Sequence, residues 1–119
     1  MLKNLLIIFF SIALFSCTNS YVKNNIKENN WQAIGEHQAK NGLLEQTETE
    51  LQTLSDKYGD GDLDYSAYQQ GYLKEIINYC QPLNAYKLGK TGRLYNGVCK
   101  RFPHGSKFRN DWDMASGDM

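Results

Sequence analysis

Apolar side chains recur at helical spacing through the middle of the chain. They form two stripes in which successive members lie three or four positions apart: Leu44, Thr47, Leu51, Leu54 and Tyr58, then Tyr65, Tyr68, Tyr72, Ile76 and Tyr79. This spacing places each set on one face of a helix, so we expect helices over 43–58 and 65–79. Asp64 stands just before the second stripe, where its side chain can accept an early backbone N–H and cap the helix.

A shorter helix is expected over 31–41, ending at Gly42. The turn at 58–62 favours an antiparallel αα-hairpin of the two longer helices. From residue 81 onward the periodicity fades, and Asn96-Gly97 indicates a turn. The predicted fold is therefore mainly α: a small helical domain over 31–110, built from an αα-hairpin plus a short N-terminal helix, with a loop-rich C-terminal part. Residues 111–119 are expected to form a disordered tail.

The N-terminus has the pattern of an export signal. Lys3 precedes an apolar stretch from Leu5 to Phe15, which is too short to span a bilayer comfortably. Leu14-Phe15-Ser16-Cys17 resembles the lipobox of bacterial lipoproteins, so we expect residues 1–16 to be removed and Cys17 to be acylated. The alternatives are ordinary signal cleavage and an uncleaved anchor. Thr18 follows the cysteine, and by resemblance to the enterobacterial sorting rule this favours the outer membrane, on its periplasmic side.

Residues 17–30 are rich in asparagine and show no clear periodicity. They are predicted to be a flexible tether with a reach of roughly 20 Å.

Cys80 and Cys99 remain once Cys17 carries the lipid. An even pair in an exported domain indicates a disulfide, which would staple the C-terminal part to the end of the 65–79 helix. Closing a loop of about 20 residues stabilises the folded state by roughly 3 kcal/mol. The alternative is a redox or metal-binding pair, which the spacing of the two cysteines does not favour.

Charge is balanced over the 119 residues, with 13 bases and 13 acids, but it is unevenly distributed. Residues 28–64 hold nine acids and two bases, whereas residues 81–110 hold seven bases and no acid. The basic segment could contact an anionic partner such as lipid head groups, lipopolysaccharide phosphates or an acidic protein surface. The candidate contacts are Lys87, Lys90, Arg93, Lys100 and Arg101. Alternatively, these bases pack against the protein's own acidic helices or are merely solvated.

We expect no catalytic residue, no metal site, no cofactor and no nucleic-acid partner. His37 and His104 form no zinc-binding or catalytic spacing. The acids from Asp56 to Asp64 fit the calcium loop of an EF-hand poorly, so a solvated acidic turn is the preferred interpretation. Gly89-Lys90-Thr91 lacks the earlier glycine of a phosphate-binding loop.

The chain also resembles a family of short proteobacterial lipoproteins known only as a domain of unknown function. The resemblance covers roughly residues 31–99, and Tyr79-Cys80 and Tyr95-x-Gly97-Val98-Cys99 are its most specific elements. It implies an envelope location and the two-cysteine architecture, and it brings no catalytic residues. We therefore expect a non-enzymatic accessory or interaction module at the outer membrane, with binding of anionic envelope components as the alternative.

Overall fold

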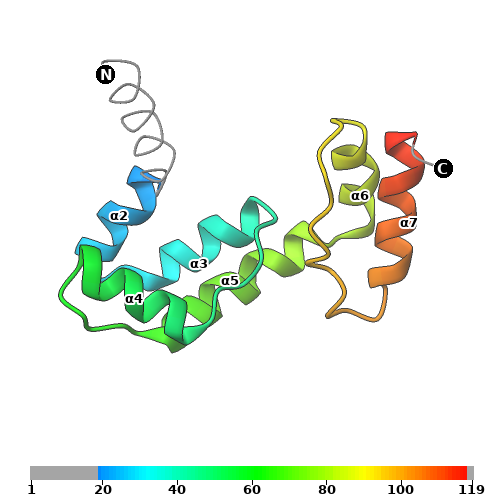
Figure 1. Cartoon of the computed structure of the whole chain (residues 1–119). Coiled ribbons are helices and arrows are strands. Elements are labelled where there is room, and N and C mark those ends of the chain that lie inside the picture. The colour runs from blue at the N-terminus through cyan, green and yellow to red at the C-terminus, as the bar shows by residue number, and fades with distance from the viewer. Residues whose placement is uncertain (1–18, 118–119) are drawn as a thin grey trace, which may run out of the picture.

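The computed structural model describes residues 19–117, and this part of the chain folds into helices and connecting loops without a strand. The mainly α fold class is confirmed. In chain order the helices are α2 (Ser20–Lys27), α3 (Trp31–Lys40), α4 (Glu48–Tyr58), α5 (Tyr65–Tyr79), α6 (Pro82–Gly89) and α7 (Gly105–Ser116) (Figure 1).

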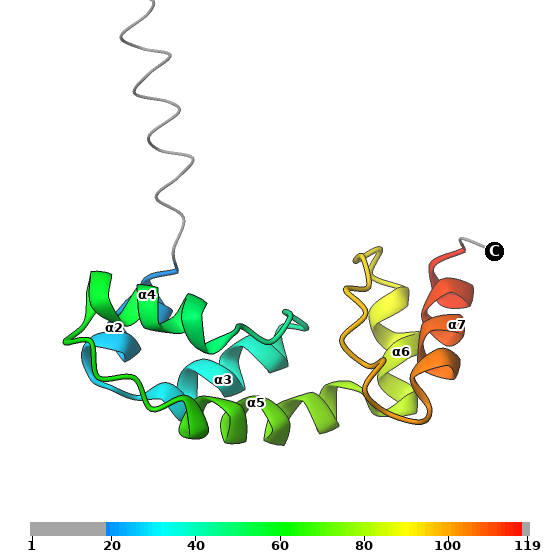
Figure 2. The same cartoon turned by 60° about the horizontal axis from the view of Figure 1, so that its bottom comes forward.

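The helices form two lobes that α5 joins (Figures 1 and 2). We call residues 19–79, with α2 to α5, the N-terminal lobe, and residues 80–117, with α6 and α7, the C-terminal lobe. Side chains also make contact across this boundary. Asn96 Nδ2 donates to the Gly42 carbonyl at 2.9 Å, Arg101 Nη1 lies 3.2 Å from Glu45 Oε2, and the rings of Tyr79 and Phe108 lie 6.4 Å apart.

The principal helix pair of the N-terminal lobe is α3 with α5, which run in the same direction (Figure 2). Glycines make this close approach possible. A Cβ atom at Gly35 or at Gly71 would lie 2.1 Å from a backbone carbonyl oxygen of the other helix. The structure thus differs from the expected hairpin, because α5 packs chiefly on α3, while α4 makes its main helix contact with α2.

Residues 43–47 do not belong to α4, although the apolar spacing predicts a helix from residue 43. They form a loop, and α4 begins at Glu48 because Thr47 Oγ1 accepts the backbone N–H of Glu50 at 3.2 Å. Tyrosine hydroxyls of α5 hold this segment. Tyr72 donates to the Leu43 carbonyl at 2.6 Å, and Tyr65 donates to the Gln46 carbonyl at 3.1 Å. Leu44, expected on the buried stripe, is instead exposed.

Residues 20–27, which we expected to be part of a flexible tether, form helix α2. The reason is burial: Val22 and Ile26 lie four positions apart and are both in the core. Asn19 caps the helix by accepting the Tyr21 N–H at 2.9 Å. Two isolated aliphatic residues among asparagines form no clear periodic pattern, so the sequence does not predict this helix. The predicted removal of residues 1–16 and the predicted acylation of Cys17 concern residues that lie outside the described part of the chain.

The C-terminal lobe is more ordered than expected. Residues 111–116 are helical in α7, so the prediction of a disordered tail is wrong for them. Phe108 and Trp112 are four positions apart and buried, and they pack with Tyr95 into an aromatic cluster. Gly89 of α6 lies against the backbone of Trp112, where a Cβ atom would approach its carbonyl oxygen to 2.5 Å. Two apolar residues are enough to fix α7 because α6 comes this close.

The predicted cap and turn are present. Asp64 Oδ1 accepts the backbone N–H of Ala67 at 3.1 Å, which confirms the start of α5. Residues 97–100 form a turn in which Gly97 has a positive φ of 78°. The tyrosine stripe of α5 lies in the core, with Tyr68, Tyr72 and Tyr79 buried.

Candidate functional site

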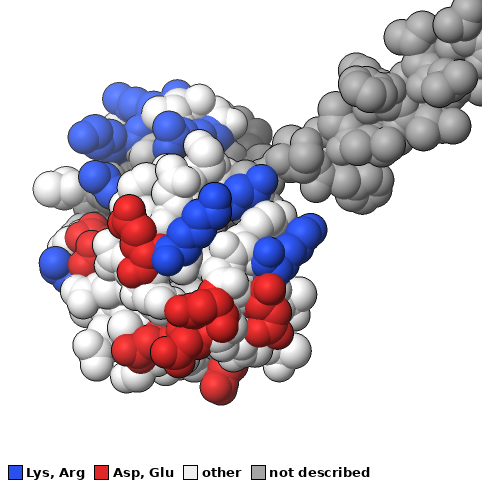
Figure 3. Space-filling view, turned by 90° about the vertical axis from the view of Figure 1, so that its left-hand side faces the viewer, with Lys and Arg blue, Asp and Glu red and all other residues white. Residues whose placement is uncertain are grey.

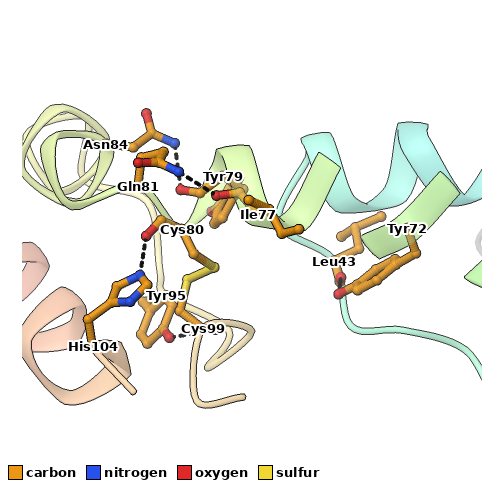
Figure 4. The surroundings of a disulfide bond; sticks show 10 residues. All are labelled: Leu43, Tyr72, Ile77, Tyr79, Cys80, Gln81, Asn84, Tyr95, Cys99 and His104. Atoms are coloured by element: carbon orange, nitrogen blue, oxygen red, sulfur yellow. Dashed lines mark hydrogen bonds between the residues drawn. A yellow bond between two sulfur atoms is a disulfide. The ribbon is translucent and has the colours of Figure 1, made fainter. Parts of the chain in front are cut away.

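Cys80 and Cys99 form a disulfide, as the sequence predicts. Both residues are buried at the point where α5 ends and the C-terminal lobe begins. Figure 4 shows the polar contacts around the bond: the backbone N–H of Cys99 donates to the Tyr95 hydroxyl at 2.9 Å, and His104 Nε2 donates to the Cys80 carbonyl at 2.8 Å. The disulfide and the hydrogen bond from His104 hold the 95–104 segment against the end of α5, while the bond from Cys99 to Tyr95 lies within that segment.

The two histidines lie in different lobes. His104 lies beside the disulfide, where it donates to the Cys80 carbonyl. The ring of Phe102 stacks on the His104 ring with centroids 5.6 Å apart. His37 of α3 lies against Tyr21 of α2, with centroids 4.4 Å apart. Within residues 19–117, no three side chains of the metal-binding types come together as a ligand set.

The acidic turn between α4 and α5 is hydrogen-bonded within the protein. Asp60 accepts from Asn29 Nδ2 and from the backbone N–H of Asp62, each at 2.9 Å. The bond from Asn29 is the main reason that the pKa of the Asp60 carboxyl is lowered. Together with the cap from Asp64, these contacts give the turn a structural role.

The structure separates the five basic residues that we singled out into two places. Lys87, Lys90 and Arg93 lie on α6 and on the loop that follows it, whereas Lys100 and Arg101 follow the disulfide. Arg101 reaches the N-terminal lobe, where it pairs with Glu45 and lies 5.9 Å from the centre of the Tyr72 ring. Arg101 is therefore paired with an acid of the protein's own N-terminal lobe, in the segment that precedes α4.

A small cleft lies beside the start of α7. Its volume is about 150 Å³, and Lys100 and Arg109 supply its positive charge, with Ser106 and the rings of Tyr95 and Phe102 completing the wall. The first turn of α7 has no side-chain cap, so its backbone N–H groups add to the positive potential of this region. Arg109 is one of the seven bases of the 81–110 segment but not one of the five predicted contacts, and its place beside Lys100 depends on α7. The spacing of Phe108 and Trp112 was the available signal.

The loop after α6 carries a second group of exposed residues. Lys90 Nζ lies 4.4 Å from the centre of the Tyr86 ring, and Arg93 is held through its carbonyl, which accepts from Trp112 Nε1 at 2.9 Å. Leu94 follows and is 87% exposed.

A family model described as "Protein of unknown function (DUF2799)" matches residues 30–116, which span α3 to α7. The chain belongs to this family. The match includes both cysteines of the disulfide and the whole basic segment, and it extends beyond the 31–99 range of the resemblance to include α7. No curated protein and no solved structure matches the chain.

Acids and bases are unequally distributed between the two lobes of the described part of the chain. Residues 19–79 hold ten acids and five bases, whereas residues 80–117 hold seven bases and two acids. The basic excess of the DUF2799 domain therefore lies in its C-terminal lobe. Figure 3 views the opposite end, and there Asp and Glu gather in the lower part of the face while Lys and Arg lie above them. In residues 19–117, no helix has the length and apolar character needed to cross a bilayer.

Proposed function

We propose that this protein is an envelope lipoprotein whose DUF2799 domain acts as a non-enzymatic accessory or interaction module, anchored to the periplasmic side of the outer membrane through lipid on Cys17. The lipobox-like Leu14-Phe15-Ser16-Cys17 after an apolar stretch carries the anchor. The Cys80–Cys99 disulfide supports the location, because such bonds persist in oxidising compartments such as the periplasm. Acyl chains contribute about 0.8 kcal/mol per buried CH₂, so a multiply acylated cysteine is a stable anchor.

Mass spectrometry of the protein purified from membranes tests the anchor. We expect the mature chain to begin at an acylated Cys17, and we expect Cys17→Ser to release the protein from the membrane fraction. A chain that begins elsewhere, or that carries no acyl group, contradicts the proposal. Density separation of the two membranes then tests the outer-membrane assignment, and crosslinking in the intact envelope identifies the partner.

A second candidate function is binding of an anionic envelope component through the C-terminal lobe. The supporting observation is that its excess of bases is largely unneutralised. Among residues 19–117, the salt bridges of its bases are Arg101 with Glu45 and Lys107 with Asp111, and the second of these lies on the surface of α7 itself. The cleft between Lys100 and Arg109 is a suitable place for an anionic group, since two cations flank it.

Vesicle binding of the mature chain with Cys17→Ser tests this second candidate without the lipid anchor. We expect binding to vesicles that contain phosphatidylglycerol or lipopolysaccharide, weak binding to phosphatidylcholine vesicles, and release as salt is raised. Lys100→Glu with Arg109→Glu is expected to weaken binding strongly. Lys27→Glu with Lys57→Glu, an equal charge change in the N-terminal lobe, is the matched control. Absence of binding at low salt, or equal loss in both variants, contradicts a site at the cleft.

A further inference from the structure

The start of the folded domain lies very close to the proposed anchor. Only Thr18 separates Cys17 from Asn19, the cap of α2. Two residues span about 7 Å even when fully extended. Since Val22 and Ile26 fix α2 in the core, a lipid on Cys17 holds the N-terminal lobe directly at the membrane surface instead of at the end of a long tether.

The loop after α6 lies on the same side of the molecule as the start of α2. Figures 1 and 2 both show the start of α2 and the loop after α6 on one side of the molecule. In Figures 1 and 2, α6 begins near the end of α5 and rises toward this loop over its eight residues. We call residues 90–94 the α6 loop. A membrane at the start of α2 therefore lies on the side to which the α6 loop points.

The chemistry of the α6 loop fits the surface of an anionic bilayer. Lys90 and Arg93 supply two cations within four positions, and Leu94 beside them is 87% exposed. Tyr86, which lies under the Lys90 ammonium group, is also exposed. Cations attract anionic head groups, while tyrosine and leucine side chains enter the boundary between head groups and acyl chains.

We propose that the α6 loop is a second membrane contact, which binds the anionic phospholipids of the same leaflet that holds the lipid on Cys17. The inference rests on the proposed lipid anchor. With one attachment at the start of α2 and another at the α6 loop, the two lobes lie side by side along the membrane in a fixed orientation.

Quenching of tryptophan fluorescence by brominated acyl chains tests the contact. Cys80 and Cys99 are bonded to each other, so Cys17 is the free thiol of the mature chain and can be attached to a maleimide lipid in phosphatidylglycerol vesicles. Leu94→Trp places the probe in the α6 loop, and Leu83→Trp is the matched control, because Leu83 is equally exposed at 88% but lies near the start of α6. The native Trp31 and Trp112 are buried.

We expect at least a twofold loss of the added fluorescence for Leu94→Trp and little loss for Leu83→Trp. Equal quenching of both probes, or no quenching of Leu94→Trp, overturns the proposal. Adding Lys90→Glu and Arg93→Glu is expected to abolish the quenching although the chain stays attached. Lys27→Glu with Lys57→Glu changes the net charge equally in the N-terminal lobe, away from both the α6 loop and the cleft, and it is expected to leave the quenching unchanged. Loss in both charge variants overturns a contact at the α6 loop.

Chemical attachment keeps this result separate from natural lipidation. A chain found unacylated in the cell contradicts the proposed anchor. An unquenched probe on a chain that is attached through Cys17 contradicts the membrane contact itself.

Discussion

Gly35 and Gly71 set the distance between α3 and α5. Each lies against the backbone of the other helix, so a side chain at either position has no space unless the helices separate. Glycine inside a helix lowers its stability by about 1 kcal/mol relative to alanine. The close approach of the two helices offsets this cost through tight packing of the core around Trp31, Tyr68 and Tyr72.

Gly71→Ala is expected to lower the free energy of unfolding by about 2 kcal/mol, because overpacking against the Gln32 backbone outweighs the gain in helix propensity. Urea unfolding followed by circular dichroism measures the change. Gln70→Ala, at the exposed neighbouring position of the same helix, is the control and is expected to be neutral or slightly stabilising. A more stable Gly71→Ala variant contradicts the close crossing of α3 and α5.

Tyr72 makes the folded state sensitive to alkaline pH. Burial raises the pKa of its hydroxyl to about 12, whereas a tyrosine in the unfolded chain ionises near 10. Between these values the unfolded state loses its proton and the folded state keeps it, so stability is full below about pH 10 and falls as the pH rises toward 12.

Tyr72→Phe is therefore expected to make the fall in unfolding free energy between pH 10 and 12 less steep, by about 1.4 kcal/mol per pH unit. Below pH 10 the variant is expected to be about 1 kcal/mol less stable, because it loses the hydrogen bond to the Leu43 carbonyl. Urea titrations at a series of pH values measure both effects. A pH dependence that matches the parent protein contradicts the burial of this hydroxyl.

At the scale of the element, several helices depend on their neighbours for stability. Isolated helices shorter than about 12–15 residues are marginal in water. α2 and α6 have eight residues each and α7 has twelve, so buried side chains must hold them in place. Local sequence patterns missed them because no regular apolar stripe marks them, whereas the fifteen-residue α5, with its regular tyrosine stripe and Asp64 cap, was predictable in both extent and face.

Trp112→Ala is expected to destabilise the C-terminal lobe by about 3–5 kcal/mol, because it removes a buried ring from the contact between α7, α6 and Tyr95. Hydrogen exchange is expected to show loss of protection in α6 and α7. Met114→Ala, at an exposed position of the same helix, is expected to change stability by less than about 0.5 kcal/mol. Equal protection in the two variants would mean that α7 does not need this anchor.

At the scale of the whole molecule, the disulfide joins the two lobes at their boundary. It ties Cys80, at the end of α5, to Cys99. His104 Nε2 donates a further hydrogen bond to the Cys80 carbonyl. Noncovalent contacts cross there too: Asn96 with Gly42 and Arg101 with Glu45 are polar, and the buried rings of Tyr79 and Phe108 lie 6.4 Å apart. The disulfide adds a covalent constraint to these contacts, which together set how the basic lobe sits beside the acidic one.

Replacing both cysteines, Cys80→Ser with Cys99→Ser, is expected to lower the free energy of unfolding by roughly 3 kcal/mol. The expected loss of hydrogen-exchange protection is greatest in residues 95–104, because this segment then keeps only noncovalent contacts with the rest of the chain, among them the hydrogen bond from His104 to the Cys80 carbonyl and the contacts of Asn96 with Gly42 and Arg101 with Glu45. Protection in α3 is the internal control, since this helix packs on α5 away from the bond. Uniform loss through both lobes would show that the disulfide stabilises the chain as a single cooperative unit.

The sequence by itself determined the features that local chemistry specifies. The period of Tyr65 to Tyr79 places one face of α5 in the core, Asp64 starts that helix, and the pairing of Cys80 with Cys99 follows from their number once Cys17 is assigned to the anchor. Tertiary structure alone decided the rest. Close backbone contact at Gly35 and Gly71 selects α3 as the partner of α5, and tyrosine hydroxyls hold the 43–47 loop on α5. Long-range packing fixes α2 and α7 and separates the basic residues into two sites, because short helices and exposed charges gain a definite position only from the residues packed around them.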